Sequence, residues 1–63
     1  MKKAALVEVL GSQQAIAELL EISKGAVSQW PPIVPELRQY QIREKIPDID
    51  RRLAAAARRR AAA

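Results

Sequence analysis

Residues 12–30, SQQAIAELLEISKGAVSQW, predict two short helices joined by a tight turn. Ser12 is a good N-cap for the first helix, because its hydroxyl can accept a hydrogen bond from a backbone N–H two or three residues later. The apolar residues behind it fall on one face at helical spacing: Ile16, Ala17, Leu19 and Leu20. The pattern breaks at Glu21 and Ile22, so we expect this helix to end at residue 20.

Ser23 can cap the second helix of the pair, which we expect over residues 24–30. Pro31 and Pro32 then end it, since proline lacks a backbone N–H and disfavours helical geometry in the residue before it. The inward positions are apolar: Ala26, Val27 and Trp30. The outward positions are small or polar: Lys24, Gly25, Ser28 and Gln29. A short polar face on a helix supported by another helix suits insertion into a DNA major groove.

The size and composition of the chain exclude several classes of function. Sixty-three residues form one small domain, and a domain of this size buries only about 60% of its unfolded surface. The chain has no Cys and no His, so disulfides, zinc fingers and catalysis by thiol or imidazole are excluded. We therefore expect no enzyme, no cofactor and no metal site, and interpret these carboxylates as caps and solvated charges: Glu36, Glu44, Asp48 and Asp50.

No stretch of the sequence is apolar enough to cross a bilayer. The longest apolar run has five residues, against the roughly 20 that a spanning helix needs. Glu8 and Gly11 interrupt the one candidate for a secretory segment. We expect a cytoplasmic protein without a membrane partner.

The positive charge is concentrated at the C-terminal end. Residues 51–63 hold five of the eleven basic residues and none of the seven acidic ones. If the protein binds phosphates, the near-neutral remainder supplies little electrostatic attraction, and the Arg-rich end or a second subunit must contribute. The alternative is that this end is only a solvated, helix-prone segment.

Further helices are expected on both sides of the central pair. Residues 2–10 predict a helix with an apolar face, and Gly11 is a natural stop after it. Residues 33–34 form a short extended link that we expect to contact the core. Pro35 suits the first position of a fourth helix, because its missing N–H would have no helical partner there.

Residues 39–46 are ambiguous between helix and strand. Tyr40, Ile42 and Ile46 lie at the even spacing of a half-buried strand, although Leu37 and Tyr40 also agree with a helix. Four consecutive alanines at 54–57 argue against a hairpin further on. We predict an all-α fold of five helices containing a helix-turn-helix. The alternative is an α+β fold with a C-terminal β-hairpin from about residue 39.

The domain is expected to cover residues 1–60, with 61–63 as a frayed tail.

The pattern Q-x-A-I-A-x-L-L-x-I-S-x-x-A-V-S-Q-W, followed by I-V-P-E and Arg38, resembles the Cro repressors of lambdoid bacteriophages over residues 2–46. The resemblance implies a small repressor that binds pseudo-palindromic, double-stranded operator DNA, as a homodimer that is weak and forms at least on DNA. Because that family has an all-α form and a form with a C-terminal β-hairpin, the ambiguity at 39–46 stays open.

The resemblance also assigns candidate DNA contacts. The base-reading positions are Lys24, Gly25, Ser28 and Gln29, and the phosphate-binding positions are Ser12, Gln13, Gln14 and Ser23. In terms of side-chain chemistry, Gln29 can contact adenine N6 and N7, and Lys24 can reach guanine O6 and N7 or a phosphate. Gly25 has no side chain to read with, and either close approach of the backbone to DNA or simple tolerance explains it.

Two features depart from the family pattern. Glu21 stands at a turn position usually held by glycine, where a left-handed backbone would cost about 1 kcal/mol. The Ala/Arg segment at the C-terminal end is the other departure, and no family property is carried onto it. Trp30 is expected to anchor the core, fully or half-buried, and Tyr40 to lie in the core or in a dimer interface.

The leading hypothesis is a sequence-specific transcriptional repressor that occupies an operator and excludes polymerase. One alternative is a helical protein-interaction module, and another is a non-specific nucleic-acid or membrane-surface binder driven by the Arg-rich end. The polar face of residues 24–29 favours the repressor over the interaction module, since protein interfaces usually need an aromatic or aliphatic centre. The candidate dimer contacts are Ile33, Val34, Tyr40, Ile42 and Ile49.

Overall fold

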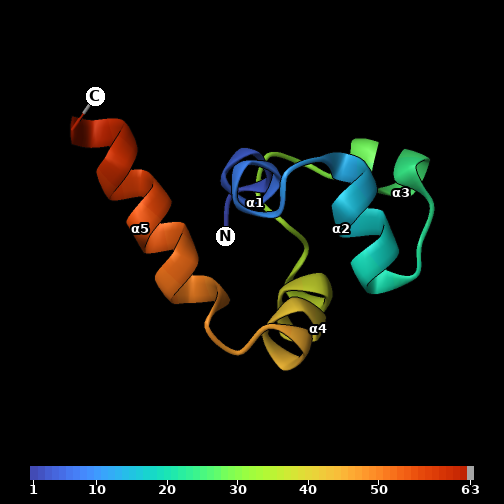
Figure 1. Cartoon of the computed structure of the whole chain (residues 1–63). Coiled ribbons are helices and arrows are strands. Elements are labelled where there is room, and N and C mark those ends of the chain that lie inside the picture. The colour runs from blue at the N-terminus through green and yellow to red at the C-terminus, as the bar shows by residue number, and fades with distance from the viewer. Residues whose placement is uncertain (63) are drawn as a thin grey trace.

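A computed structural model describes residues 1–62, apart from the side chains at positions 60 and 62, and is built from helices (Figure 1). The helices are α1 (Lys3–Leu10), α2 (Gln13–Leu20), α3 (Lys24–Ser28), α4 (Glu36–Lys45) and α5 (Ile49–Ala62). Within residues 1–62 there is no strand, only an isolated antiparallel bridge between Lys2 and Ile33. The predicted all-α fold of five helices is confirmed. The hairpin alternative is wrong, because its segment lies in α4 and α5.

The helix α1 lies in the middle of the molecule, between α5 on one side and the α2–α3 pair on the other (Figure 1). It contacts α2 and α5, while α4 closes the arrangement by contacting the same two helices. The helix α5 contacts neither α2 nor α3. The Arg-rich end of the chain is therefore held away from the helix pair that the sequence marked out for DNA.

One small core joins all five helices. Leu6 of α1, Ile16 of α2, Val27 of α3, Ile42 of α4 and Ile49 of α5 are all completely buried. Val34, in the link before α4, is also buried, as the sequence predicted. Trp30 lies half-buried against the edge of this core, which confirms its prediction as an anchor.

Both predicted serine caps are present. The Ser12 hydroxyl accepts a hydrogen bond from the Ala15 N–H at 3.0 Å, and the Ser23 hydroxyl accepts one from the Ala26 N–H at 3.1 Å. Between them, Glu21 adopts the left-handed conformation, with φ 58° and ψ 42°, and ends α2. A non-glycine residue in this conformation costs about 1 kcal/mol relative to its ordinary backbone. Glu21 therefore carries the backbone strain that the sequence predicted for a left-handed residue at this turn.

Several helix ends differ from the expectation by one or two residues. The helix α3 ends at Ser28 rather than at residue 30, and Gln29 is its C-cap. Pro31 explains the shortening, since proline pushes the preceding residue out of helical geometry. Pro35 is the N-cap of α4 rather than its first residue, and α5 continues to Ala62.

The burial of several apolar residues decides between expected placements. Tyr40 is 64% exposed and so does not lie in the core, and its expected place in a dimer interface stays a prediction. Val34, Ile42 and Ile49 are buried in the protomer, which removes them as dimer contacts. Leu37, which the sequence did not single out for a dimer, is 66% exposed. The even spacing of Tyr40, Ile42 and Ile46 does not mark a buried strand face, because Ile42 is the one fully buried residue of α4.

Candidate nucleic-acid interface

The four predicted base-reading residues all lie on the exposed side of α3 and its C-cap. Lys24, Gly25, Ser28 and Gln29 are each exposed, whereas Val27 between them is completely buried. The buried Val27 fixes which side of this short helix faces the protein. The remaining side carries a cation, a bare backbone position, a hydroxyl and an amide, which together can donate to and accept from base edges.

Gly25 leaves a bare stretch of backbone near the start of α3. A Cβ atom built at this position would lie 3.9 Å from the Ser23 hydroxyl oxygen, an ordinary contact distance. The protein therefore has room for alanine at position 25, so the glycine is not required by internal packing.

The predicted phosphate contacts gather at the start of α2 and α3. Ser12 and Ser23 are exposed caps whose hydroxyl oxygens are already occupied by backbone N–H groups. The Gln14 amide donates to the Glu18 carboxylate at 3.3 Å, one turn further along α2. Gln13 is half-buried and lies closer to α3, where its side chain meets Ser28.

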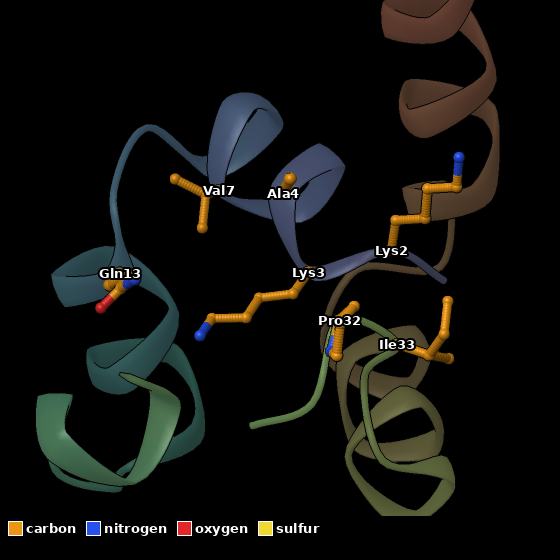
Figure 2. A pocket seen from close by; sticks show the side chains of 7 residues that line it. All are labelled: Lys2, Lys3, Ala4, Val7, Gln13, Pro32 and Ile33. Carbon is orange, nitrogen blue, oxygen red and sulfur yellow. The ribbon is translucent and has the colours of Figure 1, made fainter. Parts of the chain in front are cut away.

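Side-chain hydrogen bonds connect these positions to one another. The Ser28 hydroxyl donates to Oε1 of Gln13 at 2.6 Å, joining the end of α3 to the start of α2. The ammonium of Lys3 donates to the Ser28 carbonyl oxygen at 3.0 Å. Figure 2 shows the Lys3 side chain leaving the start of α1 toward the side of Gln13, while Lys2 points the opposite way. The structure thus brings together a predicted base contact, a predicted phosphate contact and a lysine that the sequence did not identify.

A shallow groove lies beside this network (Figure 2). Seven residues line it: Lys2, Lys3, Ala4, Val7, Gln13, Pro32 and Ile33. It has two lysines at its edge and an apolar floor, and no carboxylate lines it. Within residues 1–62, no group of His, Cys, Asp or Glu could hold a metal ion.

Ion pairs between described residues lie elsewhere: Arg52 pairs with Asp48 at 3.2 Å at the start of α5, and Arg43 pairs with Asp50 between two helices. Arg43 of α4 donates twice to the Asp50 carboxylate of α5, at 3.0 and 3.3 Å. This hydrogen bonding lowers the pKa of Asp50 below its ordinary value and raises the pKa of Arg43. The pair links α4 to α5, and because both groups are solvent-exposed it contributes little to stability.

Comparison with known proteins identifies the family. The family model described as the DNA-binding transcriptional regulator Cro matches residues 2–46. This chain belongs to the Cro family of DNA-binding transcriptional regulators. It is 40% identical to the regulatory protein cro of Salmonella phage P22 over 42 residues, which cover 67% of this chain and 69% of the phage protein. No solved structure matches the chain.

The family match defines which part of the structure carries the regulator. It runs from Lys2, the N-cap of α1, to Ile46, which follows α4, and so includes α3 and both serine caps. The helix α5 begins at Ile49, outside the matched residues. As a Cro-family regulator the protein is a DNA-binding factor rather than an enzyme. None of the helices described in residues 1–62 is long and apolar enough to cross a membrane.

Proposed function

We propose that this Cro-family regulator represses transcription by occupying a pseudo-palindromic operator, with α3 inserted in the major groove. The observation that carries this proposal is the exposed face of α3, where three of the expected reading positions are polar and the fourth, Gly25, is bare backbone, while Val27 anchors the helix from behind. Occupation of the operator excludes polymerase and needs no cofactor. We propose that the protein acts in the cytoplasm of the bacterial host.

Two side chains on this face supply base recognition. Gln29 contacts adenine through N6 and N7, and Lys24 contacts guanine O6 and N7 or a neighbouring phosphate. Gly25 permits close approach of the α3 backbone to the DNA. Ser28 shares the face, and its hydroxyl proton is already donated to Gln13.

The start of α2 meets the DNA backbone. Ser12, Gln13 and Gln14 contact phosphates there, and Ser23 contacts one at the start of α3. The N-terminal end of a helix favours anions, because its first N–H groups and its dipole both present positive charge. These contacts set the orientation of α3 without reading sequence.

A homodimer reads the two half-sites of the operator. A symmetric pair of α3 helices about one DNA turn apart matches a palindrome whose half-sites are centred about 10 bp apart. The large apolar side chains left exposed among the described residues are Ile33, Leu37 and Tyr40, at 52%, 66% and 64%. Leu37 and Tyr40 are neighbours on α4, three residues apart. We place the dimer contact on these three residues, and three side chains supply the small apolar area of a weak dimer.

Selection of binding sites from randomised duplex DNA tests this function. At about 150 mM salt the sequence-independent phosphate attraction is suppressed. We expect an inverted-repeat consensus, and a 2:1 complex with that duplex in sedimentation velocity. Leu37→Asp should convert the 2:1 complex into a weaker 1:1 complex on the same duplex. Binding without any consensus, abolished by removing residues 58–63, would show instead a non-specific binder driven by the Arg-rich end.

A further inference from the structure

Lys3 holds the chain on both sides of Gln29. Its ammonium donates to the Ser28 carbonyl oxygen at 3.0 Å, and its backbone N–H donates to the Pro32 carbonyl oxygen at 2.9 Å. One residue at the start of α1 is therefore hydrogen-bonded to both ends of the segment from Ser28 to Pro32. Val34 reinforces this contact, because its N–H donates to the Met1 carbonyl oxygen at 2.9 Å.

The segment from Ser28 to Pro32 runs beyond the end of α3, and its last bonds to that helix are the Gln29 and Trp30 N–H groups donating to the Gly25 and Val27 carbonyl oxygens. The helix α3 spans only five residues, Lys24–Ser28, so Gln29 lies just beyond its end. The last carbonyl groups of a helix lack partners within the helix, and a lysine near them satisfies one and complements the negative end of the dipole. Lys3 supplies this interaction from a helix 25 positions earlier in the sequence.

Ser28, whose carbonyl oxygen accepts from Lys3, is also the residue that joins α3 to α2. Ser28 donates its hydroxyl proton to Oε1 of Gln13 at 2.6 Å, so its side chain ties the two helices together while its carbonyl is tied to α1. The amide oxygen of Gln13 is thereby occupied, and the amide N–H groups remain as donors. Lys3, Ser28 and Gln13 form one hydrogen-bonded unit that spans three helices.

We propose that Lys3 is a positioning residue for base recognition, which fixes the backbone at the end of α3 so that Gln29 meets its base edge in one orientation. This inference rests on the proposed function, in which Gln29 reads a base. A bidentate contact needs both amide atoms correctly placed, so freedom in the Ser28–Pro32 segment reduces discrimination at that base pair. Lys3 acts through Gln29 and need not touch a base itself.

The test is operator discrimination by Lys3→Met beside Lys2→Met. Both substitutions remove one positive charge from adjacent positions, but Lys2 is exposed and its side chain points away from Lys3 (Figure 2). Binding is measured on the selected duplex and on duplexes altered at each base pair. We expect Lys3→Met to lower discrimination about three- to tenfold at the base pairs that Gln29→Ala affects, the loss expected for one hydrogen bond from a charged donor at an exposed site. Lys2→Met should weaken all duplexes equally.

Two further variants separate positioning from charge and from folding. Lys3→Arg retains a cationic donor and should restore the discrimination. Adding Lys3→Met to Gln29→Ala should cause no further loss of discrimination, because both changes act on one contact. The role of Lys3 is overturned if Lys3→Met matches Lys2→Met on every duplex. If the unsubstituted protein selects no consensus, the proposed function itself fails and the role of Lys3 fails with it.

Discussion

The α2–α3 pair and the α4–α5 pair contribute to one apolar core but have very different surfaces. In the first pair both helices begin at serine caps, and one side-chain hydrogen bond links Ser28 to Gln13. In the second pair α4 lacks a side-chain cap, and the exposed Arg43–Asp50 ion pair joins the helices. The first surface is polar with little net charge, and the second carries the arginines. The difference teaches that the arginines lie at one end of this small protein, and that the proposed base recognition lies at the other.

The largest effect tests whether both pairs share one core. Ile16 of α2 and Ile42 of α4 are both completely buried. Ile16→Ala and Ile42→Ala should each destabilise the protein by about 2–5 kcal/mol, through lost burial and the cavity left behind. Urea unfolding followed by circular dichroism measures both. A much smaller loss for Ile42→Ala would mean that α4 is not part of the cooperative unit.

The second prediction separates specificity from charge. Gln29→Ala should cost about 1–3 kcal/mol of discrimination at particular base pairs. Replacing Arg58 and Arg59 together by glutamine should leave the preferred sequence unchanged, since α5 contacts neither α2 nor α3. Any affinity that this double variant loses should be uniform across sequences and should reduce the salt dependence. Filter binding across a set of altered duplexes distinguishes the two patterns. A changed consensus for the arginine variant would place recognition in α5.

The third prediction concerns the bare backbone of α3. Gly25→Ala should raise protein stability by up to about 1 kcal/mol, because alanine favours a helix and the structure has room for its methyl group. The same methyl group should weaken operator binding where the α3 backbone approaches the DNA. Thermal unfolding and operator titration of the one variant measure both changes. Higher stability with unaltered affinity would mean that Gly25 is merely tolerated.

The fourth prediction uses the left-handed turn within the first pair. Glu21→Gly should stabilise the protein by somewhat less than about 1 kcal/mol, because relief of backbone strain exceeds the added freedom of the unfolded glycine. Gly11 provides the matched control, since its φ of 104° is unfavourable for other residues and nothing crowds its missing Cβ. Gly11→Ala should therefore destabilise the protein through backbone strain alone. Equal melting temperatures for Glu21→Gly and the parent protein would contradict a strained turn.

The smallest effect belongs to the second pair. Because Arg43 lowers the pKa of Asp50, the folded state favours the ionised carboxylate, and the ion pair adds stability above the ordinary pKa of an aspartate. This contribution is lost as the pH falls through the lowered pKa of Asp50. Asp50→Asn should slightly lower the melting temperature at neutral pH, and the difference should shrink as acid protonates the Asp50 carboxylate. A difference that persists in acid would require another cause.

The fold of the α2–α3 pair could be predicted in detail because its signals are local. Ser12 and Ser23 each predict the start of a helix, and the apolar residues between them repeat at helical spacing. The end of α3 was predicted two residues too late, although Pro31 already disfavours helical geometry before it. The contact between Lys3 and Ser28 has no local signal, because it depends on how α1 and α3 are brought together.

The C-terminal half was harder to predict because α4 buries so little. With Ile42 as its one fully buried residue, α4 has no clear apolar stripe, and even spacing could suggest a strand. Without a clear apolar stripe, the sequence does not show that Ile42 faces the core. The prediction of Ile42 and Ile49 as dimer contacts is wrong, because both are buried in the protomer. The exposure of Leu37 is not predictable from the sequence, because a leucine at this position of α4 could equally well face the core.

The most direct measurement is a titration of the isotopically labelled protein with its selected duplex, followed by amide chemical shifts. Assignment of recognition to the first pair predicts the largest shifts at residues 12–14 and 23–30, with Lys3 shifting alongside them. The amides of α5 should move little. Largest shifts along Ile49–Ala62, with α3 unaffected, would contradict the assignment and place the DNA on the Arg-rich helix.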